Sequence, residues 1–129
     1  MSTEPNIETH PLEPFLPPNA RLLMMGSFPP PKVRWKMEFY YPNYQNDMWK
    51  IFGLAFFDNK EHFLDIANKN FKEQQIRDFL MEKGIAIFDT AYQIIRLKGN
   101  ASDKFLHIAQ ATDLNKLLQQ IPECNSIMT

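Results

Sequence analysis

The chain has 129 residues, of which 44% are hydrophobic and 22% are charged, and its formal net charge at pH 7 is −1. This length and composition fit one globular domain that is large enough to bury a core, with no sign of a second domain. The near-zero charge argues against a protein that coats nucleic acid through bulk electrostatics, because that mode needs many Lys and Arg side chains. Any contact with DNA must therefore be local.

The cysteine count and the hydropathy pattern describe the cellular setting. Cys124 is the one cysteine in the sequence, so an internal disulfide framework is excluded. The sequence shows neither an early apolar run behind basic residues nor an apolar stretch long enough to cross a bilayer. We therefore expect a reducing, cytoplasmic setting, no membrane partner and a monomeric protein.

The N-terminal segment, residues 1–19, is rich in proline. Its prolines forbid a regular helix and favour an extended or polyproline II arm on the surface of a domain that spans residues 20–129. The apolar run over residues 21–25, halted by Gly26, then predicts a strand that is buried on both faces.

Residues 27–45 are rich in proline and aromatic residues and show no clear period. An irregular stretch of this length usually has a function in an ordered protein, so we interpret it as the candidate active-site loop. A helix is predicted over residues 46–54, with Asn46 or Asp47 as its N-terminal cap.

Two further amphipathic stretches, residues 60–68 and 71–83, predict helices, and Gly84 is the expected C-terminal cap of the second. A second buried strand is predicted over residues 85–88, ending on Asp89. Helices between two buried strands favour a crossover connection and a parallel strand pair.

After a polar loop, Ser102 or Asp103 is a possible cap for a helix, residues 113–120 predict another helix, and residues 126–128 begin a third strand. The predicted fold class is α/β, a three-layer α/β/α arrangement around a central, mainly parallel sheet. Because the last predicted strand ends at Thr129 without a closing helix, we expect the C-terminal part of the domain to be missing.

Ligands of open parallel sheets bind beyond the carboxyl ends of the strands, which points to the loops over residues 26–31 and 89–92. The first loop has no Gly-Lys-Ser/Thr pattern and its prolines remove backbone donors, so nucleoside triphosphate hydrolysis is not expected. The histidines are scattered without a Cys or carboxylate cluster, so no metal site is expected. Ser27 does not stand in a serine-hydrolase elbow.

A small basic patch lies within residues 29–50, where basic residues alternate with aromatic ones against only two acidic residues. This is the one place where the sequence predicts contact with DNA phosphates. The predicted phosphate contacts are Lys32, Arg34 and Lys36.

The strand-and-loop segment over residues 22–30, Leu-Leu-Met-Met-Gly-Ser-Phe-Pro-Pro, and residues 39–49, Phe-Tyr-Tyr-Pro-Asn-Tyr-Gln-Asn-Asp-Met-Trp, together resemble the first motif of one branch of the uracil-DNA glycosylase superfamily. That branch includes bacterial and archaeal uracil and deoxyinosine DNA glycosylases. The His10-Pro11 pair is also similar to the lead-in of these proteins. The resemblance covers roughly residues 10–129 and is weakest after Asn100.

The resemblance implies a DNA base-excision repair enzyme that flips a deaminated base, uracil or hypoxanthine, out of DNA and hydrolyses its N-glycosidic bond. The chemistry needs only water and electrostatics, so no cofactor is expected, and the lone Cys124 disfavours the iron–sulfur cluster of some branches. In this scheme Asn46 matches the residue that orients the attacking water. The alternative is that Asn46 only caps the helix that begins there.

The resemblance also implies residues that bind the base. An aromatic run would provide a face for stacking, although three consecutive aromatic residues in an extended segment cannot all face one side, so part of the run is expected in the core. The glycine-containing loop would bring backbone N–H groups close to the base or water, or it is an ordinary strand-ending turn. The implied contacts are Gly26, Ser27, Phe28, Phe39, Tyr40 and Tyr41.

Asp89 departs from the pattern, because many members of the superfamily have an asparagine at the end of this strand. An ionised carboxylate only accepts hydrogen bonds, from N1–H of hypoxanthine or N3–H of uracil, which favours a deaminated purine. Alternatively, Asp89 is a turn or capping residue. Asp47 also departs, since deoxyinosine-active relatives tend to carry a basic residue there, and an acid would repel DNA phosphate.

The second motif of the superfamily, which stabilises the leaving base, is expected beyond Thr129. Two other classes of function stay open. A non-catalytic DNA- or nucleotide-binding module would keep the aromatic and basic residues without a positioned water. A structural or partner-binding domain would bury the aromatic run and use Asn46 only as a cap.

Overall fold

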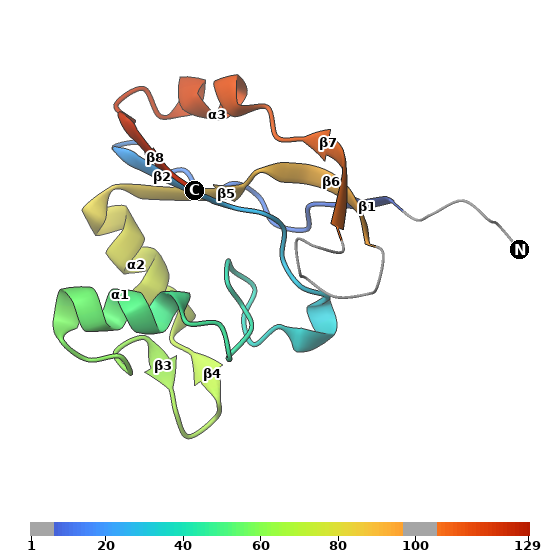
Figure 1. The fold of residues 1–129 in the computed structure, drawn as a ribbon. Coiled ribbons are helices and arrows are strands. Elements are labelled where there is room, and N and C mark those ends of the chain that lie inside the picture. Colours follow the sequence, from blue (N-terminus) through green and yellow to red (C-terminus); the bar gives the residue numbers. More distant parts are fainter. Residues whose placement is uncertain (1–6, 97–105) are drawn as a thin grey trace, which may run out of the picture.

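The computed structural model describes residues 7–96 and 106–129. Within these ranges the chain has a mixed α/β fold with two three-stranded sheets and a two-stranded ribbon (Figure 1). The first sheet is parallel and has the strand order β5 (Ile85–Asp89), β2 (Leu22–Gly26), β8 (Ser126–Met128). The second is antiparallel and has the order β1 (Ile7–Thr9), β6 (Ala91–Arg96), β7 (Leu106–Ala111).

The parallel sheet confirms the three strands predicted from apolar runs. Leu23 and Met24 on β2 are almost fully buried, and all five residues of β5 are buried. A strand that packs on both faces reads as a continuous apolar run because neither face meets water. Leu22 pairs with Ile85 and Gly26 with Asp89, so β2 and β5 end together at the same edge of the sheet.

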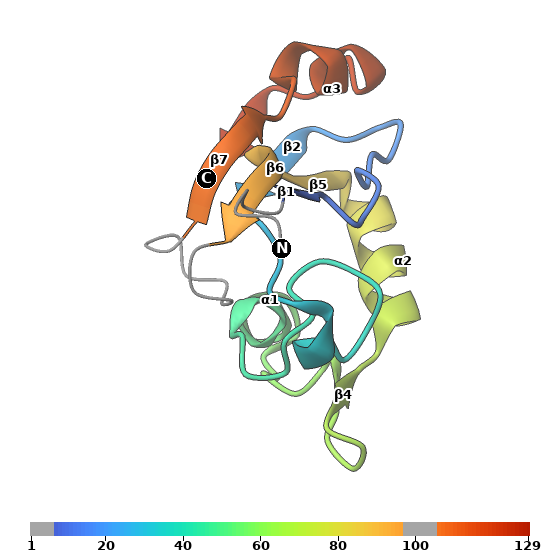
Figure 2. The same ribbon diagram turned by 90° about the vertical axis from the view of Figure 1, so that its right-hand side faces the viewer.

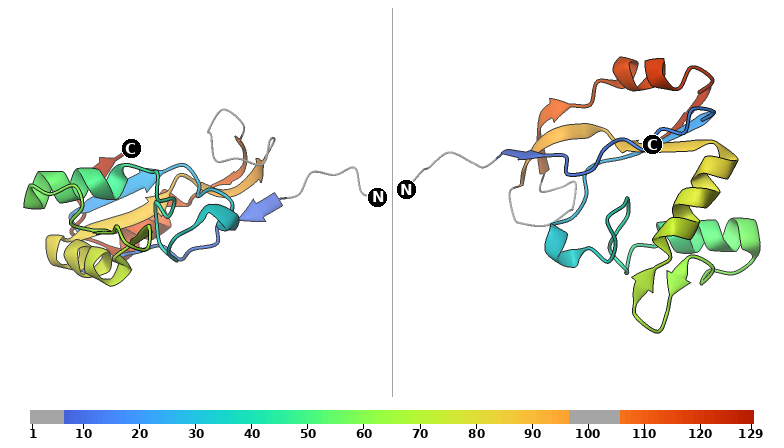
Figure 3. Two further views of the ribbon diagram at one scale, coloured as in Figure 1. Left: turned by 90° about the horizontal axis from the view of Figure 1, so that it is seen from below. Right: turned by 180° about the vertical axis from the view of Figure 1, so that it is seen from behind.

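The helices lie on both sides of the parallel sheet. Figure 1 shows α3 (Leu114–Gln120) above it and α1 (Met48–Phe57) and α2 (Glu73–Lys83) below it, and Figures 2 and 3 show the same division from other sides. Among the helices of the described residues, none is long and apolar enough to cross a membrane.

The helix ends follow local chemistry. Gly84 caps α2 in the left-handed conformation, with φ of 70°, as predicted. The Asp113 carboxylate accepts a hydrogen bond from the Lys116 N–H at 3.2 Å and caps α3. Helix α1 begins at Met48, two residues later than predicted.

The predicted helix over residues 60–68 is wrong. This segment forms turns and the ribbon of β3 (Leu64–Asp65) and β4 (Asn70–Phe71). The Asn59 side chain accepts from the Glu61 N–H at 2.9 Å, and the Asp65 side chain bonds Asn68. Such short-range bonds from Asn and Asp to nearby groups compete with helical hydrogen bonds, which overrides the amphipathic pattern.

The antiparallel sheet was not predicted. β1 comes from the proline-rich arm, which therefore packs onto the domain, and Phe15 further along the arm exchanges two backbone hydrogen bonds with Ile87. The residues of β1 are exposed or half-buried, so the arm pairs with a distant strand and still lies at the surface. The predicted cap at Ser102 or Asp103 lies outside the described residues, and the segment after it forms β7 instead of a helix.

Candidate functional site

The carboxyl ends of β2 and β5 open into two loops that stay side by side. The Thr90 N–H donates to the Gly26 carbonyl at 2.8 Å and the Ala91 N–H to the Ser27 carbonyl at 3.3 Å. This is the edge of a parallel sheet at which ligands bind, and both candidate loops of the sequence meet there.

A cavity of about 210 Å³ lies at this edge. Its walls come from three parts of the chain: the loop after β2, the segment before α1 and the end of β5. The lining residues are Ser27, Phe28, Pro29, Pro30, Arg34, Tyr40, Tyr41, Pro42, Asn43, Asn46 and Asp89. The structure thus brings most of the predicted site residues together.

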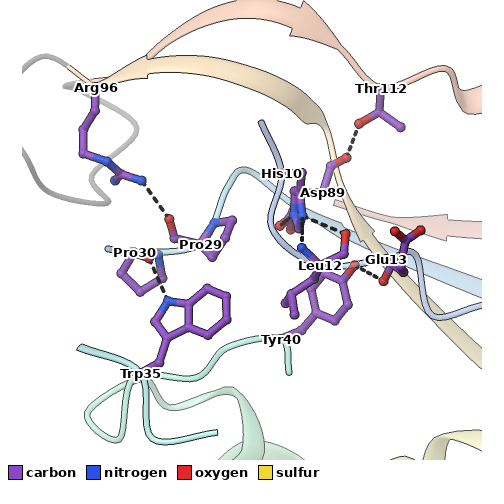
Figure 4. Close-up of polar contacts among 10 residues, drawn as sticks. All are labelled: His10, Leu12, Glu13, Pro29, Pro30, Trp35, Tyr40, Asp89, Arg96 and Thr112. Carbon is purple, nitrogen blue, oxygen red and sulfur yellow. Dashed lines mark hydrogen bonds and ion pairs between the residues drawn. The ribbon is translucent and has the colours of Figure 1, made fainter. Parts of the chain in front are cut away.

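Asp89 forms the inner end of this cavity. Its side chain is 6% exposed, and its Oδ2 lies 2.7 Å from Nε2 of His10, whose side chain is fully buried (Figure 4). The Thr112 hydroxyl donates to the Asp89 carbonyl and ties β5 to the segment after β7. Within the part of the chain that the structure describes, Asp89 Oδ1 has no hydrogen-bond partner.

Gly26 makes room for this arrangement. A methyl group at Gly26 would lie 2.9 Å from Asp89 Oδ1 and 3.4 Å from the Tyr41 hydroxyl oxygen. The absence of a side chain here lets the carboxylate and the phenol approach the backbone of β2. Gly26 therefore shapes the floor of the site although it does not line the cavity.

The aromatic run divides between the core and the cavity. Phe39 is 2% exposed and packs in the core against Phe15 and Trp49, whereas Tyr40 and Tyr41 line the cavity. Tyr41 has φ of 52°, a left-handed conformation that is uncommon for a residue with a side chain and that turns the run toward the cavity.

Both tyrosines are held as neutral phenols. Burial raises the pKa of Tyr41 to about 12, and the negative charge of Asp89 adds to this shift. Burial and then Asp89 also raise the pKa of Tyr40 far above its usual value, and the Tyr40 hydroxyl donates to the Glu13 carbonyl at 2.9 Å. The Trp49 indole N–H donates to the Tyr40 carbonyl at 2.9 Å and fixes the backbone of the run.

Asn46 stands at the outer rim of the cavity and is exposed. Its Oδ1 accepts a hydrogen bond from the Met48 N–H at 2.8 Å, so it does serve the start of α1, as the simpler interpretation of the sequence held. A carbonyl oxygen has a second lone pair, so this bond leaves an acceptor for a water. Asn43, which the sequence analysis did not select, also lines the cavity.

One of the three predicted phosphate contacts lies at the cavity. Arg34 lines it, whereas Lys32 and Lys36 are exposed outside the lining. The Trp35 indole N–H donates to the Pro30 carbonyl at 2.7 Å (Figure 4). Lys32 Nζ lies 5.4 Å from the Trp35 ring centre. The short helix η1 (Lys32–Arg34) is thereby fastened to the loop after β2.

His10 is the residue of the site that sequence reasoning missed. A single histidine in a proline-rich arm carries no local signal, and its partner Asp89 is 79 residues away. The one indication in the sequence was that the His10-Pro11 pair precedes the segment that resembles the first glycosylase motif, as it does in that branch. His10 also lines a second cavity of about 600 Å³ between the arm, β6, β7 and α3.

Across residues 7–96 and 106–129, no three His, Cys, Asp or Glu side chains come together in a group that would hold a metal ion.

The fold has a solved counterpart. The chain is similar to the solution NMR structure of a putative uracil DNA glycosylase from Methanosarcina acetivorans, with a TM-score of 0.64 and 21% sequence identity. The similarity covers 95% of this chain and 68% of the other. No protein-family model matches the chain, and a search of curated proteins found no match. At this identity the likeness shows a common fold.

Proposed function

We propose that the protein is a DNA glycosylase that hydrolyses the N-glycosidic bond of a deaminated base in DNA. The observation that carries the proposal is the cavity at the ends of β2 and β5, which joins Asn46, Tyr41 and Asp89 in a fold similar to that of the Methanosarcina acetivorans protein. A three-layer α/β/α arrangement, a monomeric state and a cytoplasmic location remain predictions that accompany this proposal.

The cavity suits a single flipped base. Sites for drug-sized molecules have volumes of roughly 300–1,000 Å³, and the volume of about 210 Å³ here is smaller. Phe28, Tyr40 and Tyr41 offer aromatic faces, and stacking on such a face contributes roughly 1–3 kcal/mol per base.

Asp89 would recognise the edge of the base. Its Oδ2 is held by His10, and its Oδ1 is available to accept a hydrogen bond. Hypoxanthine presents N1–H and uracil presents N3–H, and either suits this acceptor. The neutral phenol of Tyr41 beside Gly26 is an available donor for a base carbonyl, which supports a base that carries both groups.

Asn46 would orient the water that attacks the sugar. It lines the same cavity as Asp89 from the opposite segment, and its amide keeps one acceptor site beside the Met48 bond. The transition state places positive charge on the sugar and negative charge on the departing base, so a fixed water and fixed dipoles supply the catalysis.

DNA would be held by local contacts. Arg34 lines the cavity, Lys32 and Lys36 are exposed close to it in the sequence, and each contact with a phosphate would displace a counterion. The net charge of −1 fits a protein that binds DNA through this one patch.

A second candidate is a non-catalytic module that binds DNA or a nucleotide. The observation that favours it is the bond between Asn46 Oδ1 and the Met48 N–H, since a helix start alone explains that residue. Such a module would bind the base without releasing it.

The test is base release, read as strand cleavage after alkali, on oligonucleotides that carry one uracil, hypoxanthine or xanthine. The natural full-length protein that carries this sequence is compared with its Asn46→Ala variant and with Asn115→Ala, an exposed asparagine on α3, as a matched control. We expect release by the parent and by Asn115→Ala, and a loss of roughly 100-fold or more in Asn46→Ala. Binding without release would support the second candidate.

A further inference from the structure

His10 lies between the two cavities and has no part in the proposed chemistry. Its ring is fully buried against three aromatic rings, with centroid distances of 5.2 Å to Phe28, 4.5 Å to Phe88 and 5.9 Å to Tyr40. A polar ring in such surroundings must satisfy both nitrogens, and it does.

The hydrogen bonds of His10 fix its orientation. Nε2 lies 2.7 Å from Asp89 Oδ2, and Nδ1 lies 3.1 Å from both the N–H nitrogen and the carbonyl oxygen of Leu12 (Figure 4). A neutral ring with its proton on Nε2 donates to Asp89 and accepts from the Leu12 N–H. A ring protonated on both nitrogens donates to Asp89 and to the Leu12 carbonyl. Both assignments give an ionised Asp89 an N–H donor, whereas a neutral ring with its proton on Nδ1 would fit only a carboxylic acid that donates to Nε2.

Asp89 depends on this donor. Its Oδ2 points to His10, and the groups around the pair are mostly aromatic carbon. Three ionisable groups from other elements line the cavity with Asp89: the guanidinium of Arg34 and the neutral phenols of Tyr40 and Tyr41. The Tyr40 hydroxyl donates to the backbone carbonyl of Glu13. On the far side of His10, the second cavity carries the charged residues Glu13, Asp113 and Lys116.

We propose that His10 is a positioning residue that holds the Asp89 carboxyl group with its Oδ1 available to the cavity as a hydrogen-bond acceptor, and that this sets the discrimination between deaminated bases and the amino bases from which they derive. The inference rests on the proposed function and adds a residue and a specificity mechanism to it.

The discrimination follows from hydrogen-bond polarity. Hypoxanthine carries a hydrogen on N1 where adenine has a lone pair, and uracil carries one on N3 where cytosine has a lone pair. A carboxylate oxygen accepts a hydrogen bond from the N–H of hypoxanthine or uracil and repels the lone pair of adenine or cytosine. With adenine or cytosine the buried carboxylate also lacks a donor, which strongly disfavours binding of these bases. A protonated Asp89 would donate to the lone pair of the parent base and lose this preference.

Two substitutions at His10 separate the effect of its N–H donor from the effect of its ring size. His10→Phe keeps a flat ring and removes both polar atoms, so the carboxylate loses the partner that orients it among apolar rings. His10→Gln restores an N–H donor. Leu80→Ala, a fully buried residue of α2 outside both cavities, is the control for a general loss of stability.

The first readout is the NMR chemical shift of the Asp89 carboxyl carbon in the ligand-free protein at neutral pH. We expect His10→Gln and Leu80→Ala to keep the wild-type shift and His10→Phe to change it, because only His10→Phe removes the donor to Asp89 Oδ2. An unchanged shift in folded His10→Phe would overturn the inference, whatever the protein does with DNA.

The second readout is binding of free hypoxanthine and of free adenine. We expect the ratio of the two affinities to fall at least tenfold in His10→Phe, to recover in His10→Gln and to stay unchanged in Leu80→Ala. An unchanged ratio in His10→Phe would overturn the inference. If the wild type binds neither base, the proposed function fails, while the carboxyl signal still decides whether His10 holds Asp89 in position.

Discussion

His10 Nε2 and Asp89 Oδ2 lie 2.7 Å apart across 79 residues of sequence, and this bond ties the N-terminal arm to the end of β5. Both side chains are buried. Buried polar partners are costly to separate, because each one loses its solvation in the protein and then lacks its partner.

A double-mutant cycle measures this dependence. His10→Phe and Asp89→Leu are each expected to lower the free energy of unfolding by about 3 kcal/mol. The double variant should lose clearly less than the sum, with a coupling of about 1–3 kcal/mol, because it leaves no unpaired group. Urea unfolding followed by tryptophan fluorescence gives all four values, and additive losses would contradict the pairing.

Gly26→Ala tests the close approach beneath the cavity. The new methyl group would lie 2.9 Å from Asp89 Oδ1, so we expect a loss of about 1–3 kcal/mol in stability and weaker base binding. Gly84→Ala is the matched control, because its strain arises from a φ of 70° at the end of α2, away from the cavity. Gly84→Ala should lower the stability of the protein and leave its affinity for the base unchanged. An equal loss of base affinity in both variants would contradict the role of the close approach between Gly26 and Asp89.

Stability above pH 10 should depend on Tyr41. Its pKa rises from 10.0 to about 12 on folding, so the folded state keeps a proton that the unfolded state has released. The contribution is fully present below about pH 10 and is lost as the pH rises toward 12. The free energy of unfolding of Tyr41→Phe should therefore fall less between pH 9 and pH 11 than that of the wild type. Urea titrations at the two pH values measure this change, and an equal fall in the unfolding free energy of the two proteins would contradict the raised pKa of Tyr41.

Asn46 should contribute to the start of α1 as well as to the chemistry. Asn46→Ala removes the acceptor of the Met48 N–H, and we expect a loss of roughly 0.5–2 kcal/mol. Asn46→Asp keeps an acceptor and adds a negative charge near a helix N-terminus, so its stability should match that of the wild type. Thermal unfolding of the two variants checks this, and equal destabilisation of both would show that the bond has no role.

Local patterns were enough to predict the strands of the parallel sheet and the end of α2. The apolar runs that became β2 and β5, and the cap residue Gly84, act through neighbours in sequence, so their signals are readable without a fold. The turn-forming side chains Asn59 and Asp65 were visible too, but the amphipathic spacing masked them.

The antiparallel sheet and the inner part of the site depend on distant contacts. Strand β1 has three residues and is stabilised only by its hydrogen bonds to β6, which is distant in the sequence. The role of His10 likewise depends on its contact with Asp89 in the folded chain. The loop after β2, the tyrosines and Asn46 were selected from the sequence and its resemblance, and the structure places them around one cavity. Their roles in binding and catalysis stay predictions.

The central claim is that the cavity at the ends of β2 and β5 binds a deaminated base. The most direct measurement is an NMR titration of the labelled protein with hypoxanthine, with adenine as the comparison ligand. The account predicts that hypoxanthine shifts the amide signals of Ser27, Phe28, Tyr41 and Asp89 saturably and that adenine does so far more weakly. Unchanged signals at these residues, or shifts confined to the second cavity beside α3, would contradict it.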